Sequence, residues 1–349
     1  SAISLGIVAA SSAIPIMLFN FIGGIISDKY NIRRILFFLS FFIFLILIFL
    51  GYLDYSGVVQ PYHVYICSIL LGILLGIDFP ARNAYFPKII PEKYLRSGIS
   101  LNGATMAGSS VVVPTIGGFL IAEYGSFIGI LLSAIGYLVM SISTFFIPSV
   151  SITKDDSSNF SFFTEGFSYV VKNELFYCLI LLTYCTNFFI FGYIQALPAF
   201  IDVFNGTPRE LGLMFSCAGL GALSGLLTAG KVNINKNLGA IILSSATFFS
   251  VLIILVSLVG VGIMPTYVPY TNILLIFPLA TIGHFGNGFY MLSTYAVIQS
   301  KVPESIRGRV MGIVAIHISI GVLGGLWVGG VGEIFNMRVG VGSGPIICI

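Results

Sequence analysis

Residues 23–34 read Gly-Gly-Ile-Ile-Ser-Asp-Lys-Tyr-Asn-Ile-Arg-Arg, and this short charged stretch separates two apolar runs at about 5–26 and 35–53. Runs of about 20 apolar residues are long enough to cross a bilayer as helices. A tight charged turn between two such runs is typical of a helical hairpin in a membrane. The stretch therefore predicts a polytopic, all-helical membrane protein.

The composition of the whole chain supports this prediction. Of 349 residues, 57% are apolar and 8% are charged, and the mean hydropathy is +1.04. Soluble domains carry roughly a quarter charged residues. The alternating strand pattern of outer-membrane barrels is absent from the sequence. No metal site is expected, because the five cysteines show no ligand spacing.

Continuous apolar runs predict ten spans in two sets of five. They lie at about 5–26, 35–53, 63–88, 97–121 and 127–148, and then at about 174–200, 210–230, 238–262, 271–300 and 309–335. If the loop 27–34 is cytoplasmic, 13 of the 16 Lys and Arg residues lie on that side. This positive-inside bias predicts a multi-pass protein of the plasma membrane, with loop 27–34 and linker 149–173 in the cytoplasm.

The spans group into two bundles, residues 1–148 and 174–349, joined by the linker 149–173. The second part of the linker has the apolar spacing of an amphipathic helix at the inner membrane surface, or of the start of the next span. Because the chain opens at Ser1 without a signal peptide, we expect one further helix before it and one after Ile349, which gives twelve spans. A ten-span protein is the alternative.

The two bundles repeat each other weakly. The pairs Pro91-Glu92 and Gly117-Gly118 both recur 212 residues later, and Gly24 has a counterpart in Gly225, 201 residues later. Internal duplication of helix bundles is the sequence sign of a secondary transporter that works by alternating access.

With the stretch 23–34, the sequence resembles the major facilitator superfamily, whose loop between helices 2 and 3 reads Gly-x-Leu-Ala-Asp-[Arg/Lys]-x-Gly-[Arg/Lys]-[Arg/Lys]. The resemblance implies a latch that holds the outward-open state, formed by Gly24, Asp28, Arg33 and Arg34. Asn31 replaces the family's glycine, and asparagine tolerates left-handed backbone. The alternative is that Asp28 is only a solvated helix end.

Residues 109–118 resemble the antiporter motif of the family's exporters, Gly-x-x-x-Gly-Pro-x-x-Gly-Gly. Pro114, Gly117 and Gly118 match it, whereas Ser109 and Val113 replace two glycines. Proline bends a helix, and glycines allow close packing, so a purely structural kink is the alternative. Flanking segments such as 302–312 are similar to the branch that includes macrolide-efflux and enterobactin-export proteins. The resemblance implies two pseudo-symmetric helix bundles and a monomer.

Ionisable side chains inside spans are functional candidates, because a charge in hydrocarbon is costly. Asp78 and Arg82 lie one turn apart in the third predicted span and can pair, either as a coupling site or as a fixed pair. His284 and His317 could relay a proton or could simply be packed. The remaining candidates are uncharged polar residues within spans: Asn187, Gln195 and Asn287.

These observations predict a proton-driven exporter of hydrophobic or amphipathic small molecules, and not an enzyme. No nucleotide-binding motif occurs in the sequence, so the proton gradient is expected to supply the energy without a cofactor. The expected partners are the substrate and the lipid bilayer, without nucleic acid. The alternatives are an importer or uniporter of a small metabolite and, from another class, a polytopic membrane enzyme or a scaffold.

Overall fold

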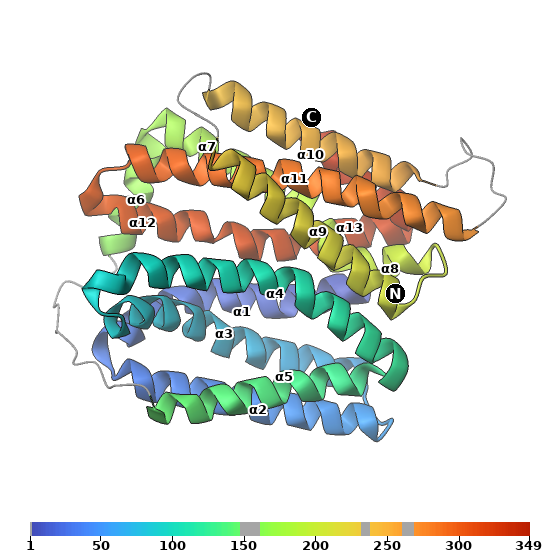
Figure 1. Ribbon diagram of the computed structural model, residues 1–349, viewed down its shortest axis with the longest axis horizontal. Coiled ribbons are helices and arrows are strands. Elements are labelled where there is room, and N and C mark those ends of the chain that lie inside the picture. Colours follow the sequence, from blue (N-terminus) through green and yellow to red (C-terminus); the bar gives the residue numbers. More distant parts are fainter. Residues whose placement is uncertain (1, 147–160, 232–237, 260–268) are drawn as a thin grey trace. The chain divides into compact units, whose positions relative to one another are not determined.

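The computed structural model describes residues 2–146, 161–231, 238–259 and 269–349, and every regular element within these ranges is helical (Figure 1). Apolar segments in lipid form helices because each backbone N–H and C=O must find its partner within the segment. Eight of the described helical segments are long and apolar enough to cross a membrane. The predicted all-helical, multi-pass architecture is confirmed, and helices occupy most of each predicted span, with breaks inside 174–200 and 309–335.

The chain divides into two compact units. Unit 1 comprises residues 1–6, 107–119 and 160–349, and unit 2 comprises residues 7–106 and 120–159. The middle of the fourth helix therefore groups with unit 1. The bundle boundaries expected from the sequence stay a prediction.

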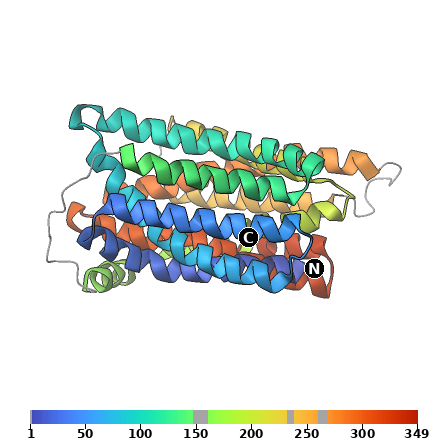
Figure 2. The same ribbon diagram turned by 90° about the horizontal axis from the view of Figure 1, so that it is seen from below.

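Unit 2 contains most of the first five long helices, of which α2 packs against both α3 and α5 (Figures 1 and 2). Gly72 and Gly76 of α3 lie directly against the backbone of α1 at Ser12 and Ile16, where a side chain would not fit. Gly125 turns the chain between α4 and α5 with a φ of 85°. The elements of this part of the chain are α1 (Ala2–Lys29), α2 (Ile32–Tyr55), α3 (Pro61–Ile89), η1 (Glu92–Tyr94), α4 (Leu95–Tyr124), α5 (Ser126–Ser143) and η2 (Thr144–Phe146).

Unit 1 is built on α9, which packs along α11 (Figure 1). Helix α10 packs against α11 and α14. Its core contains fully buried side chains from several of these helices, including Phe200, Phe249 and Ile276. The elements are α6 (Ser161–Lys172), α7 (Glu174–Cys185), η3 (Thr186–Phe191), α8 (Tyr193–Asp202), α9 (Pro208–Ala229), α10 (Leu238–Leu258), α11 (Pro269–Lys301), α12 (Glu304–Ala315), α13 (His317–Ile334) and α14 (Met337–Cys348).

Two features of unit 1 go beyond the sequence prediction. Helix α14 was not expected, because its glycines lower helix propensity, but packing against α13 and α10 supports it. In the linker, α6 forms a separate helix that packs on α12 through Val170. Phe167 and Val171, one turn apart, are more than half exposed. The polar cluster at residues 154–159 lies outside the described residues.

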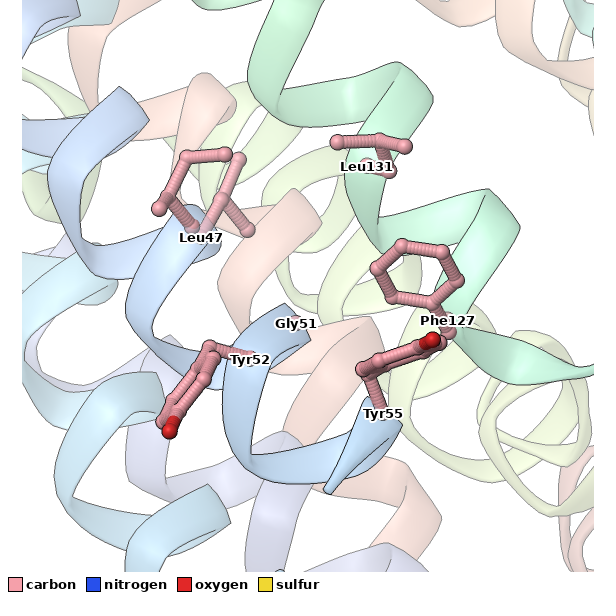
Figure 3. Close-up of a pocket in the computed structure, with 7 residues that line it drawn as sticks. Leu47, Gly51, Tyr52, Tyr55, Phe127 and Leu131 are labelled. Atoms are coloured by element: carbon pink, nitrogen blue, oxygen red, sulfur yellow. The ribbon is translucent and has the colours of Figure 1, made fainter. Parts of the chain in front are cut away.

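A shallow groove lies between α2 and α5 of unit 2 (Figure 3). Tyr55 and Phe127 stand side by side at its edge, with ring centroids 5.0 Å apart, and Gly51 forms its floor. The lining is apolar and aromatic throughout. None of its lining residues carries a charged or amide side chain for catalysis or polar recognition.

Candidate functional site

An ion pair inside α3 joins the two charged residues expected in this span. Arg82 donates to Asp78 from Nε to Oδ2 at 2.5 Å and from Nη2 to Oδ1 at 2.8 Å. Asp78 is 5% exposed, whereas the Arg82 side chain is 37% exposed. Helical geometry alone brings residues four apart together. The bidentate contact neutralises a carboxylate that would otherwise be costly in a span.

A third polar group lies near this pair. Tyr137 of α5 is within electrostatic reach of both Asp78 and Arg82. Sequence reasoning missed it, because nothing in the sequence distinguishes Tyr137 from the other tyrosines. The site in unit 2 therefore contains a carboxylate, a guanidinium and a phenol from two helices.

The charged turn between α1 and α2 differs from expectation at Asn31. Its backbone is extended (φ −63°, ψ 106°) and not left-handed, and its Oδ1 accepts a hydrogen bond from the Arg33 N–H at 3.1 Å. Asn31 is thus the N-cap of α2, a position that needs a side-chain acceptor. The Arg33 guanidinium donates to the Phe145 carbonyl at 2.5 Å, and Arg34 is exposed. Gly24 and Asp28 lie outside the residues whose surroundings the structure describes.

The proline–glycine motif of α4 packs against α9 within unit 1. An added side chain at Gly118 would meet the backbone of Pro208 and Gly212, whereas Gly117 faces open space. Only one glycine of the expected pair is therefore needed for close packing. The motif brings α4 and α9 to backbone contact at this point.

Hydrogen bonds fasten the same two helices one turn away. Pro114 bends the helix at this point, and Gly219 of α9 packs directly against the Ser110 carbonyl of α4. Ser216 donates to the Val111 carbonyl at 2.5 Å, and its oxygen lies 2.5 Å from the Thr115 hydroxyl. Sequence reasoning missed Ser216. The spacing Gly212, Ser216, Gly219, which places small residues on one helix face, could have revealed it.

His284 of α11 is packed inside unit 1 and is only 2% exposed. Its Nδ1 lies 3.0 Å from the Ala280 carbonyl, and its Nε2 lies 3.5 Å from the Tyr193 hydroxyl. The rings of Phe249, Tyr193 and Phe191 surround the imidazole at centroid distances of 5.3, 6.0 and 6.3 Å. The expected titratable group is thus present in a neutral, aromatic cage.

The other polar candidates take separate places in unit 1. Asn287 is 7% exposed, and its Oδ1 has no hydrogen-bond partner. Asn187 donates to the Thr183 carbonyl at 2.8 Å, and Gln195 packs against Gly325 of α13. His317 hydrogen-bonds the Val314 carbonyl at 2.7 Å, beside the break between α12 and α13. Of these, Asn287 is one turn from His284 on α11.

The sequence profile of the Major Facilitator Superfamily matches residues 1–326. The chain belongs to the major facilitator superfamily. Proteins of this superfamily are membrane transporters, so the chain acts on a small-molecule substrate within a lipid bilayer and is not an enzyme. The family assignment confirms the superfamily resemblance carried by residues 23–34.

Two relatives and one solved structure illustrate this membership. The staphyloferrin A transporter of Staphylococcus aureus is 24% identical over 97% of this chain and 83% of its own length. The enterobactin exporter EntS of Shigella boydii is 25% identical over 78% of this chain, which spans only 63% of that exporter. A POT family transporter crystallised with a thioalcohol-conjugated peptide has a TM-score of 0.74 at 12% identity, covering 100% of this chain and 86% of that one. The last likeness establishes the superfamily fold.

Proposed function

We propose that this superfamily member exports hydrophobic or amphipathic small molecules, such as drugs or secondary metabolites, in exchange for protons. The Asp78–Arg82 pair is the observation that carries the proposal. Asp78 is a buried carboxylate in a span, and a single guanidinium on the same helix neutralises it. Taking up a proton would remove the charge of Asp78 and release Arg82, which is partly exposed. Intramembrane acids commonly serve proton relays in this way.

The outward direction is supported by the likeness to the enterobactin exporter. The name of the staphyloferrin A transporter further suggests secondary metabolites as the substrate class. We place the protein in the plasma membrane as a monomer, with the proton gradient as its only energy source. The excess of Lys and Arg supports a cytoplasmic loop 27–34 and a cytoplasmic linker 149–173.

The test uses everted membrane vesicles that contain the complete reading frame and a fluorescent dye that reports the pH gradient. Ethidium and enterobactin, added separately, serve as probes of the two proposed substrate classes. We expect the gradient to collapse when a transported probe is added, and we expect Asp78→Asn to abolish this response. Asp54→Asn is the matched control, because Asp54 is a partly exposed carboxylate near the end of α2 that accepts a hydrogen bond from the Ser126 hydroxyl at 2.6 Å.

Each other outcome has a defined meaning. A full response in Asp78→Asn would remove this acid as the coupling group. Accumulation of a probe in intact cells, instead of its depletion, would favour the importer or uniporter. A probe that moves without any change of the pH gradient would exclude proton exchange.

A further inference from the structure

The span Glu174–Asp202 contains a π-helical turn, η3, between α7 and α8. A π turn accommodates an extra residue in a helix and often marks a functional site. Here the Asn187 side chain closes the turn by donating to the Thr183 carbonyl at 2.8 Å. A side chain within the π turn therefore supplies a hydrogen-bond donor to the backbone carbonyl that precedes the turn.

Neighbouring helices are shaped to receive this turn. The Phe188 carbonyl rests on Gly324 of α13, and the Phe189 carbonyl rests on Gly344 of α14. In both places an added Cβ would collide with the carbonyl group, so only glycine fits. Glycines on two separate helices thus allow the backbone of the π turn to pack closely against α13 and α14, which indicates that the turn is a fixed part of the fold.

The turn places two aromatic residues against one imidazole. The rings of Phe191 and Tyr193 both lie within 6.3 Å of the His284 ring, measured between centroids. In a regular α-helix, residues two apart do not share a face. The π turn and the turn at Gly192 that follows it therefore bring the Tyr193 hydroxyl to His284 without losing the packing of Phe191.

The hydrogen bonds of the cage assign its protons. Because a carbonyl can only accept, Nδ1 of His284 carries a hydrogen and donates it to Ala280. In the neutral ring Nε2 is then an acceptor, and the Tyr193 hydroxyl donates to it. One turn along α11, the buried Oδ1 of Asn287 receives no hydrogen bond. This face of α11 is one donor short, and buried acceptors are rarely left unpaired.

We propose that His284, Tyr193 and Asn287 form a proton-binding site within unit 1. The site rests on the proposed proton coupling and assigns it a second location, apart from Asp78. On loading, Nε2 forms a bond to a proton delivered by water. The Tyr193 oxygen then accepts from Nε2–H, and its own hydrogen becomes available to water.

The surroundings of His284 explain why loading requires a conformational change. The rings of Phe191 and Tyr193 from the π-containing span and of Phe249 from α10 pack on the imidazole, and Gly221 of α9 packs against the Cβ of His284. Tyr193 is the one titratable group among these, and none is charged. An imidazolium without a counter-ion is costly in such a cage. The packed arrangement is thus the proton-free state, and the proton-loaded state is one in which water reaches the ring.

The test measures proton binding without any substrate. Proteoliposomes adsorbed on a solid-supported membrane are exposed to a jump from about pH 7.5 to about pH 5.5, which brackets histidine titration, and the transient charge displacement is recorded. We expect a displacement in the wild type, a large decrease in His284→Asn that leaves only the contribution of Asp78, and a smaller decrease in Tyr193→Phe. Tyr184→Phe is the matched control, because its hydroxyl also lies in unit 1 but donates to the Ile313 carbonyl at 2.6 Å.

The possible results separate this inference from the proposed function. A full displacement in His284→Asn that is lost in Asp78→Asn overturns the inference and leaves proton exchange standing. A large decrease in His284→Asn, in a protein that moves neither ethidium nor enterobactin, supports the site but not the export of these probes. No displacement in the wild type overturns both. If His284→Asn does not insert into the membrane, Tyr193→Phe, which removes a single oxygen atom, is measured in its place. A decreased displacement in Tyr193→Phe supports the site, and a full displacement overturns it.

Discussion

The protein accommodates the ionisable side chains of Asp78 and His284 within spans in opposite ways. Asp78 is charged and carries its own counter-ion one turn away on α3, whereas His284 is neutral and depends on groups from three other helices. The first site is local, since the helix alone assembles it. The second is tertiary, since it exists only when the surrounding helices are packed. A span can therefore hold an ionisable group in two ways. A counter-ion on the same helix can neutralise its charge, or neighbouring apolar and aromatic side chains can keep it uncharged.

The largest effect is expected from breaking the local pair on one side. Arg82→Ala leaves the Asp78 carboxylate without a partner and should destabilise the protein by about 2–3 kcal/mol, below the value for fully buried pairs because Arg82 is partly exposed. Replacing both residues, with Asp78→Asn and Arg82→Gln, should restore stability to within about 1 kcal/mol. The measurement is the thermal unfolding midpoint of purified variants in one detergent. If Arg82→Ala is as stable as the double variant, the Asp78 carboxylate does not depend on Arg82 for its neutralisation.

The next effect tests the tertiary site through its scaffold. Gly324→Ala introduces a methyl group against the Phe188 carbonyl and should cost about 1–3 kcal/mol, as expected for overpacking. Gly330→Ala is a matched control on the same helix, because nothing lies within 4 Å of its added Cβ. The same thermal midpoints separate the two variants. Equal midpoints would mean that the π turn yields easily and does not fix Tyr193.

The Asp78–Arg82 pair could be predicted from the sequence, whereas the surroundings of His284 could be predicted only in part. The spacing of Asp78 and Arg82 determines their contact once the segment is helical. His284 was recognisable as an ionisable residue in a span, but its partner Tyr193 was not. The π turn at residues 186–191 has an apolar sequence that reads as ordinary helix, and the glycines that seat it could equally serve any close packing. Such features depend on neighbouring helices, which a single sequence does not place.

The α4–α9 contact extends the same distinction to hydrogen bonds. Ser216→Ala removes the hydrogen bonds of its hydroxyl with the Val111 carbonyl and the Thr115 hydroxyl, both of which join the two helices, and should cost about 1 kcal/mol. Ser224→Ala on the same helix removes only a local bond to the Gly221 carbonyl at 2.8 Å and should be close to neutral. Thermal midpoints of the two variants give the difference directly. If both fall equally, the hydroxyl of Ser216 contributes no more than a local one.

The smallest effect is expected at Tyr193, and this expectation distinguishes a proton site from a structural one. The distance from its hydroxyl to Nε2 of His284 is 3.5 Å, so Tyr193→Phe should lower stability by no more than about 0.5 kcal/mol. The hydroxyl of Tyr184 donates at 2.6 Å to Ile313, beside the break between α12 and α13, so Tyr184→Phe should cost about 1–2 kcal/mol. Tyr184→Phe should thus lower stability more than Tyr193→Phe, whereas Tyr193→Phe should decrease the charge displacement more than Tyr184→Phe. A hydroxyl that served only packing would change stability and leave the displacement unaltered. If Tyr193→Phe proves the less stable of the two variants and binds protons normally, the tyrosine is a structural member of the cage, and His284 must exchange its proton without it.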